Sequence, residues 1–67
     1  MHSREVLRLL REDGWYVHHI TGSHHQMRHP DKPGTTTVTH PQQDVPIGTL
    51  VNIEKQSGVR LRPQRRR

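Results

Sequence analysis

A scarcity of apolar side chains is the feature that most constrains how this chain can fold. Hydrophobic residues occupy 27% of its 67 positions, and without cysteine no disulfide can compensate for a small core. A chain of this length forms one domain at most and buries only about 60% of the surface that it exposes when unfolded. Nearly all the burial must come from Val6, Leu7, Leu9, Leu10, Trp15, Val17, Ile20, Met27, Val38, Val45, Ile47, Leu50, Val51 and Ile53.

The first segment has the pattern of an amphipathic helix. Apolar side chains recur at helical spacing at Val6, Leu7 and Leu10. Ser3 is a typical N-cap residue, and Gly14 suits the left-handed conformation in which many helices end. The pattern predicts a helix over Arg4–Asp13.

The middle of the chain has the composition of strands separated by turns. Aromatic and β-branched residues favour strands over Trp15–Ile20 and Thr35–Thr39, and His24–His29 is predicted to pair with the first of these. Glycine and proline mark the connections, at Gly22 and over Pro30–Gly34. We therefore expect three short strands joined by turns.

A second helix is predicted over Pro46–Ser57. Pro46 suits the first helical position, where its missing N–H costs nothing, and Gly58 is a natural stop. The side chains expected to face the core are Ile47, Leu50 and Val51, with Glu54 next in line. The resulting order α-β-β-β-α predicts an α+β fold, in which a three-stranded antiparallel sheet carries two helices on one face.

The net charge of +5 is concentrated at the C-terminus. The arginines after position 59 equal the whole excess, and they are Arg60, Arg62, Arg65, Arg66 and Arg67. Residues 1–59 carry equal numbers of acidic and basic side chains. We expect a domain over residues 1–59 and a basic, disordered tail over 60–67, a kind of segment that often binds RNA.

The alternation of side chains along His24–His29 separates two sets of residues. Met27 is the only apolar residue of this segment and belongs to the core side, which His25 and His29 share. The side presented to solvent then carries His24, Gln26 and Arg28. Such a set can hold a phosphodiester, because arginine pairs with phosphate oxygens, an amide bonds to a base or sugar, and imidazole moves protons near neutral pH.

Four short motifs occur in order along the chain: Gly14-Trp15, Gly22-Ser23-His24-His25-Gln26, His29-Pro30 and Pro46-Ile47-Gly48-Thr49-Leu50. Their ordered combination resembles the HicA family of toxin–antitoxin toxins, over about Ser3 to Gly58. Met27 stands where the family usually has phenylalanine. The Gln42-Gln43-Asp44 segment stands where the family is often rich in lysine.

The resemblance implies a fold like a double-stranded-RNA-binding domain and a cytoplasmic ribonuclease that inhibits translation by cleaving messenger RNA. The catalytic histidine of the family directly follows the Gly-Ser pair, a position that His24 occupies here. The implied partner is a HicB-type antitoxin, which covers the active face and joins the toxin in an oligomer. We expect no membrane span, since no apolar run approaches about 18 residues.

The chemistry inferred for His24 needs no metal or other cofactor, because the 2′-hydroxyl of RNA is itself the nucleophile. His24 is expected to act as general base on that hydroxyl or as general acid on the 5′-oxygen, while Arg28 offsets developing charge. The candidates for a second proton-transfer residue are His40 and His25. Further RNA contacts are expected at Ser23, Gln26, Gly48 and Thr49.

Several expectations have an ordinary structural alternative. Gly48 and Thr49 lie where the positive N-terminus of the second helix could seat a phosphate, but ordinary first-turn geometry explains them equally well. Trp15 is expected to anchor the core rather than stack on a base. His25 and His29 are expected to serve packing and hydrogen bonding at the strand edge.

Two other classes of function stay open. A zinc or nickel site could use His24, His25 and His29, or His18 and His19, although cysteine is absent and adjacent strand residues point to opposite faces. A module that binds RNA without cleaving it, or a degenerate toxin that only partners the antitoxin, would fit the same fold. The neutral domain body and a second helix with only Lys55 argue against a strong RNA binder.

Overall fold

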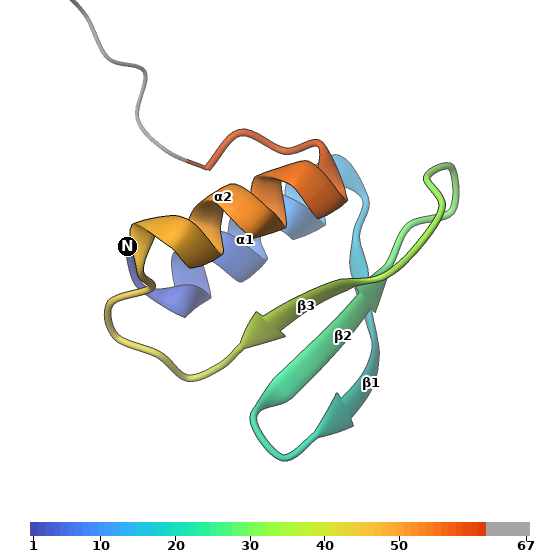
Figure 1. Cartoon of the computed structure of the whole chain (residues 1–67). Helices are drawn as coiled ribbons and strands as arrows, with labels where there is room; N and C mark the ends of the chain where they lie inside the picture. Colours follow the sequence, from blue (N-terminus) through green and yellow to red (C-terminus); the bar gives the residue numbers. More distant parts are fainter. Residues whose placement is uncertain (62–67) are drawn as a thin grey trace, which may run out of the picture.

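The computed structural model describes residues 1–61 and confirms the predicted element order (Figure 1). The elements are α1 (Ser3–Asp13), β1 (Tyr16–Thr21), β2 (His24–Arg28), β3 (Thr36–Thr39) and α2 (Ile47–Ser57). The strands form an antiparallel meander with β2 in the centre, and both helices lie on one face of it. Of the predicted basic tail, residues 62–67 lie outside the described part of the chain.

Helix α1 begins one residue earlier than predicted, and Ser3 is not its N-cap. The N-cap is His2, whose ring Nδ1 accepts a hydrogen bond from the backbone N–H of Arg4 at 2.9 Å. Ser3 is fully buried, and its hydroxyl lies 2.7 Å from Nδ1 of His40 and accepts from the N–H of Gln42 at 2.8 Å. The serine therefore holds the segment after β3 instead of capping its own helix.

Gly14 ends α1 as predicted, and the structure shows why glycine is needed there. Its φ of 114° lies in the region that L side chains rarely adopt, and its N–H donates to carbonyls of the last helical turn. A Cβ at this position would lie 2.7 Å from Nε2 of His29. That nitrogen is 2.7 Å from the carbonyl oxygen of Asp13, so His29 packs over the end of the helix.

Helix α2 buries a different stripe from the predicted one. Pro46 is the N-cap, and the buried residues of the helix are Leu50, Ile53 and Ser57. Ile47, predicted to face the core, is 64% exposed, and Val51 is only partly buried. At about 100° per residue, Ile47 and Val51 point well to one side of the stripe that faces the sheet.

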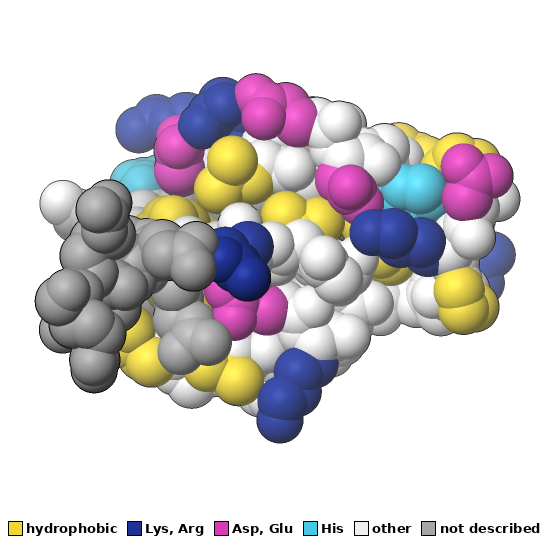
Figure 2. Space-filling model, turned by 90° about the horizontal axis from the view of Figure 1, so that it is seen from above, with side chains coloured by type: hydrophobic (Ala, Val, Ile, Leu, Met, Phe, Trp, Pro, Cys, Tyr) yellow, Lys and Arg dark blue, Asp and Glu magenta, His cyan; other side chains and the backbone are white. Residues whose placement is uncertain are grey.

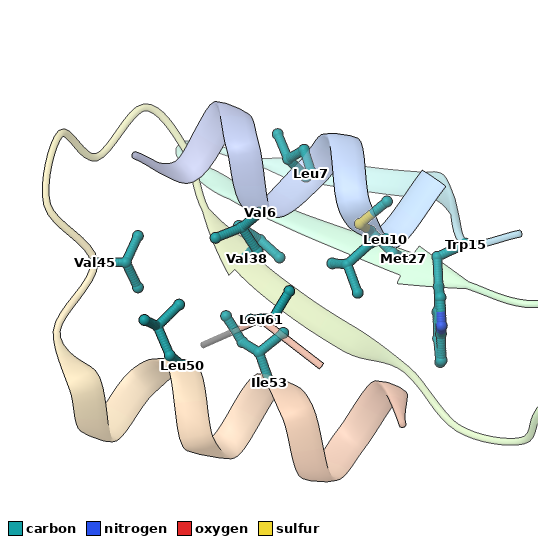
Figure 3. Close-up of a cluster of buried hydrophobic side chains, with 10 residues drawn as sticks. All are labelled: Val6, Leu7, Leu10, Trp15, Met27, Val38, Val45, Leu50, Ile53 and Leu61. Atoms are coloured by element: carbon teal, nitrogen blue, oxygen red, sulfur yellow. The ribbon is translucent and has the colours of Figure 1, made fainter. Parts of the chain in front are cut away.

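The core fills the space between the helices and one face of the sheet (Figure 3). Its buried hydrophobic side chains are Val6, Leu7, Leu10, Trp15, Met27, Val38, Val45, Leu50, Ile53 and Leu61. Leu61 is not among the core residues expected from the sequence, yet it is only 3% exposed, and its N–H donates to the carboxylate of Glu54. Leu9 and Val17 are only partly buried at the edge of this cluster.

The C-terminal ends of the two helices are tied together by Lys32, from the loop between β2 and β3. Its ammonium donates to the Asp13 carboxylate at 2.6 Å and to the carbonyl oxygen of Ser57 at 3.0 Å. The hydrogen bond from Lys32 holds the pKa of Asp13 below its usual value. A cation at this place also suits the negative ends of both helix dipoles.

Candidate functional site

The two faces of the sheet differ sharply in burial. Met27 and Val38 point to the helices and are 0% and 1% exposed. Side chains that alternate with them lie on the other side, which we call the open face because neither helix covers it. The strand register assigns eight residues to the open face: Tyr16, His19, Thr21, His24, Gln26, Arg28, Thr37 and Thr39.

A β-bulge decides which histidines of β1 reach the open face. Val17 pairs with Met27, the next residue has no partner on β2, and pairing resumes with His19 opposite Gln26. The extra residue, His18, reverses the alternation that an unbroken strand would follow. His19 therefore shares the side of Gln26, whereas Ile20 shares the covered side of His25.

Ile20 is predicted to contribute to the core, and this prediction is wrong. The residue lies on the covered side of the sheet but at the hairpin end, where it is 52% exposed. Figure 1 shows that the β1–β2 hairpin extends beyond the two helices, which therefore do not cover that end. The sequence pattern identifies the strand but not how far the helices reach along it.

His24 begins β2 immediately after the turn at Gly22 and Ser23. The turn requires the positive φ of 59° that Gly22 supplies, and it pairs Thr21 directly with His24. On its other side His24 is opposite Thr39 of β3. Its side chain is exposed and makes no hydrogen bond to any residue within 1–61, so both ring nitrogens can meet a ligand.

Gln26 and Arg28 follow His24 along the same side of β2, as the alternation predicts. Gln26 is half-buried between His19 on β1 and Thr37 on β3, and Arg28 is exposed opposite Tyr16. An imidazole, an amide and a guanidinium thus lie in a row along one strand. Such a row can accept an extended polyanion whose phosphates and sugars pass along β2.

The open face carries no carboxylate. The six acidic residues of the chain lie on other elements: Glu5, Glu12 and Asp13 on α1, Asp31 and Asp44 in loops, and Glu54 on α2. On the side that carries the helices, Figure 2 shows acidic and basic side chains next to one another. Arg8, for example, is ion-paired with both Glu5 and Glu12. The open face, by contrast, carries the guanidinium of Arg28 with no acidic side chain among its eight residues.

The two candidates for a second proton-transfer group lie together on the covered side of the sheet. The rings of His25 and His40 meet edge to face, with centroids 5.2 Å apart, and His40 also contacts Ser3. Burial, with smaller effects from His25, His2 and neighbouring arginines, lowers the pKa of His40 below its usual value. His25 and His40 are therefore separated from His24 by the sheet itself.

The remaining predicted residues are dispersed. Ser23 is exposed in the turn, and its carbonyl oxygen accepts from the N–H of His40 at 2.8 Å. Gly48 and Thr49 lie in the first turn of α2, in the helical layer and away from the open face. Gly48 has open space where a Cβ would stand. The structure thus groups His24, Gln26 and Arg28, and separates Gly48 and Thr49 from them.

Three open-face residues on the outer strands were not among the predicted site residues, namely Tyr16, His19 and Thr37. Strict alternation would place His19 on the side of Val17, and only the unpaired His18 moves it. A sequence shows no bulge, because the extra residue has a meaning only relative to the partner strand. For Thr37, alternation about the buried Val38 gives the face, and the pairing of β2 with β3 shows that it lies opposite Gln26.

Among residues 1–61, no three histidine, aspartate or glutamate side chains come together in an arrangement that could hold a metal ion. Within the same residues, neither helix has the length and apolar character needed to cross a membrane. The candidate functional site is the open face, because the strand register brings His24, Gln26 and Arg28 together there.

Comparison with known proteins identifies one family. A family model described as the HicA toxin of bacterial toxin-antitoxin systems matches residues 3–59. This stretch runs from the first residue of α1 to just beyond α2 and includes every open-face residue. No curated protein matches the chain.

Proposed function

The chain belongs to the HicA toxin family, and from this premise we propose that it is a metal-independent endoribonuclease that cleaves messenger RNA and so inhibits translation. The observation that supports the proposal best is the position of His24. This histidine follows the Gly-Ser pair, is exposed on the open face, and shares that face with Gln26 and Arg28.

The reaction uses the nucleophile that RNA itself carries. The 2′-oxygen attacks the adjacent phosphorus while the P–O5′ bond breaks, which leaves a 2′,3′-cyclic phosphate and a 5′-hydroxyl. His24 either takes the proton of the 2′-hydroxyl or supplies a proton to O5′, and such proton transfer contributes roughly 10²–10⁴-fold. Arg28 offsets negative charge on the phosphorane oxygens, and Gln26 and Ser23 hold the adjoining sugar or base.

A HicB-type antitoxin is the proposed partner. Family membership supports an antitoxin partner, and the open face offers it a surface whose coverage would also exclude RNA. A purified complex is expected to show no cleavage, and His24 in it should resist carbethoxylation by diethyl pyrocarbonate. Rapid modification of His24 in an inactive complex would mean that the antitoxin inhibits from another surface.

The decisive experiment compares the purified chain with His24→Ala and His18→Ala on a long RNA, each with and without EDTA. We expect EDTA-resistant cleavage by the parent chain, loss of cleavage in His24→Ala, and near-parental cleavage in His18→Ala. The last variant is a matched control, because it removes an exposed histidine one strand away. Circular dichroism should be identical for all three proteins.

The other outcomes identify the alternatives. Cleavage that survives in His24→Ala would move the chemistry to another residue or to a contaminant. RNA binding without cleavage by the parent chain would favour a non-catalytic RNA-binding module. Neither binding nor cleavage would favour a degenerate toxin that acts only as a partner of the antitoxin.

The arginine-rich end of the chain is proposed to bind further phosphates of the RNA. A truncation to test this must stop after Leu61, because that side chain belongs to the core. Removing residues 62–67 takes away four arginines. The dependence of log affinity on log salt should then weaken by roughly 0.7 for each phosphate that the tail neutralises on single-stranded RNA. An unchanged salt slope would contradict a role for the tail in RNA binding.

A further inference from the structure

Resting on the ribonuclease activity proposed above, we propose that His19 is the second proton-transfer residue and forms a catalytic pair with His24 across the open face. The sequence offers seven histidines, and the register of β1 and β2 selects this one. Among the histidines that have a partner in the strand ladders, His19 is the one that shares the face of His24, since His25 lies on the covered face.

The geometry follows from the regular part of the β1–β2 ladder. Between the bulge and the turn, His19 is opposite Gln26, Ile20 is opposite His25, and Thr21 is opposite His24. His19 is therefore the diagonal neighbour of His24, and residues in this relation lie about 7–8 Å apart. Two imidazole rings at that spacing can contact opposite sides of one phosphodiester.

Both imidazoles are available to a ligand. The side chains of His19 and His24 are exposed, and neither imidazole ring makes a hydrogen bond to a residue within 1–61. Gln26 lies directly opposite His19 and two residues beyond His24 on the same face, where it can bond to the sugar or base between them. Neither ring has a carboxylate beside it on that face to compete with phosphate.

The two histidines together carry out both proton transfers that the reaction needs, without a further reagent. One imidazole takes the proton of the 2′-hydroxyl as the 2′-oxygen bonds to phosphorus. The other, protonated, imidazole gives its proton to O5′ as the P–O5′ bond breaks. The two histidines end with exchanged protonation states, which water restores before the next turnover.

In this arrangement the bulge at His18 is the feature that places His19 on the open face. An unbroken strand continuing from Val17, which faces the helices, would turn residue 18 to the open face and residue 19 to the covered face. The single extra residue places His19 opposite Gln26 instead. Bulges commonly re-aim a side chain next to an active site, and here the re-aimed side chain is an imidazole.

His25 and His40 are less suitable for the same task. They lie on the covered side of the sheet and contact each other, and His40 is held by Ser3. The sheet lies between these two rings and a phosphodiester that contacts His24 on the open face. His19 and His24, by contrast, lie on the same face and can contact one phosphodiester together.

The test uses the full chain and two substrates made for one mapped cleavage site. The first is an RNA oligonucleotide, and the second carries sulfur in place of the bridging 5′-oxygen. A thiolate leaves without a proton, so the second substrate does not need a general acid. The proteins compared are the parent chain, His19→Ala, His24→Ala and, as a matched neighbour, His18→Ala.

We expect both His19→Ala and His24→Ala to lose roughly 10²–10⁴-fold in kcat/KM on the normal RNA, while His18→Ala stays near the parent. The bell-shaped pH profile of the parent should lose one limb in each of the two variants. The sulfur substrate should restore cleavage by one of these variants, which identifies the general acid, and not by the other. Thermal midpoints should not change.

Three results would overturn the pairing. These are parental cleavage by His19→Ala, a greater loss in His18→Ala than in His19→Ala, and failure of the sulfur substrate to rescue either variant. Each leaves the ribonuclease activity itself standing, provided that the parent chain cleaves RNA and His24→Ala does not. If the parent cleaves neither substrate, the proposed function fails first and the pair has no reaction to serve.

Discussion

The covered and open faces of the sheet are made from the same three strands, yet they have opposite properties. The covered face contributes Met27 and Val38 to the core, where both are almost fully buried. The open face carries histidines, an amide and an arginine, and none of its side chains belongs to the buried core. One residue step along β2 therefore leads from a buried core side chain to a polar side chain on the open face.

This difference teaches that strand register alone can align polar side chains on a face that contributes nothing to the buried core. An exposed strand face needs only register, because pairing with two neighbours aligns its side chains. The consequence is that open-face substitutions should change the reaction while covered-face substitutions should change folding.

The largest expected effect comes from a neighbouring pair on β2. Met27→Ala removes a side chain that is 0% exposed and should lower the free energy of unfolding by about 2–5 kcal/mol. Gln26→Ala, one residue away on the open face, should change it by about 0.5 kcal/mol or less. Urea denaturation followed by circular dichroism measures both, and similar losses in the two variants would break the distinction between the faces.

A smaller loss of stability is expected from alanine at two glycines with positive φ, Gly14 at the end of α1 and Gly22 in the β1–β2 turn. Gly14→Ala should cost about 1–3 kcal/mol, since it combines a strained positive φ with a Cβ that meets the ring of His29. Gly22→Ala, at a φ of 59° beside His24, meets no atom within 4 Å and should cost less. Thermal denaturation ranks them, and a larger loss at Gly22 would contradict the role of the His29 contact.

A smaller effect again is expected from a pair of arginines with equal charge. Arg28→Gln on the open face should lower kcat/KM on RNA by about tenfold, because an exposed cation near the phosphate is partly screened by water. Arg11→Gln on α1 removes the same charge from the helical side and should leave kcat/KM nearly unchanged. Equal losses would indicate attraction by net charge rather than by position.

The smallest effect is a dependence of stability on pH. Burial lowers the pKa of His40 in the folded state, so the unfolded chain binds its proton more tightly. The stability contributed by neutral His40 is therefore present above about pH 6.5 and declines as the pH falls through the lower folded value. His40→Asn retains a polar group near Ser3 but cannot titrate.

Thermal midpoints between pH 7.5 and 5 should accordingly fall less in His40→Asn than in the parent. An equal fall in both proteins would assign the acid sensitivity to other groups, of which His25 and His2 are the nearest to His40. Because His40 lies on the covered side, this experiment tests whether its burial there contributes to stability.

The sequence by itself was sufficient for the elements and their order. Helical spacing in α1, β-branched residues in the strands and the glycine and proline stops are local signals, and each depends only on residues close to it in the chain. Alternation about Met27 also placed His24, Gln26 and Arg28 on one exposed side, because a single buried residue orients a whole strand. Whether these three residues catalyse the reaction stays a prediction.

Only the tertiary structure decided which distant residues meet. Ser3 contacts His40 instead of capping its helix, and Leu61 belongs to the core. Ile20 and Ile47 are exposed. His25 and His40 contact each other on the side of the sheet opposite His24. The tertiary structure also revealed the bulge that turns His19 toward the open face. These outcomes depend on strand register and on how far the helices extend over the sheet, and both are set by contacts between residues far apart in the chain.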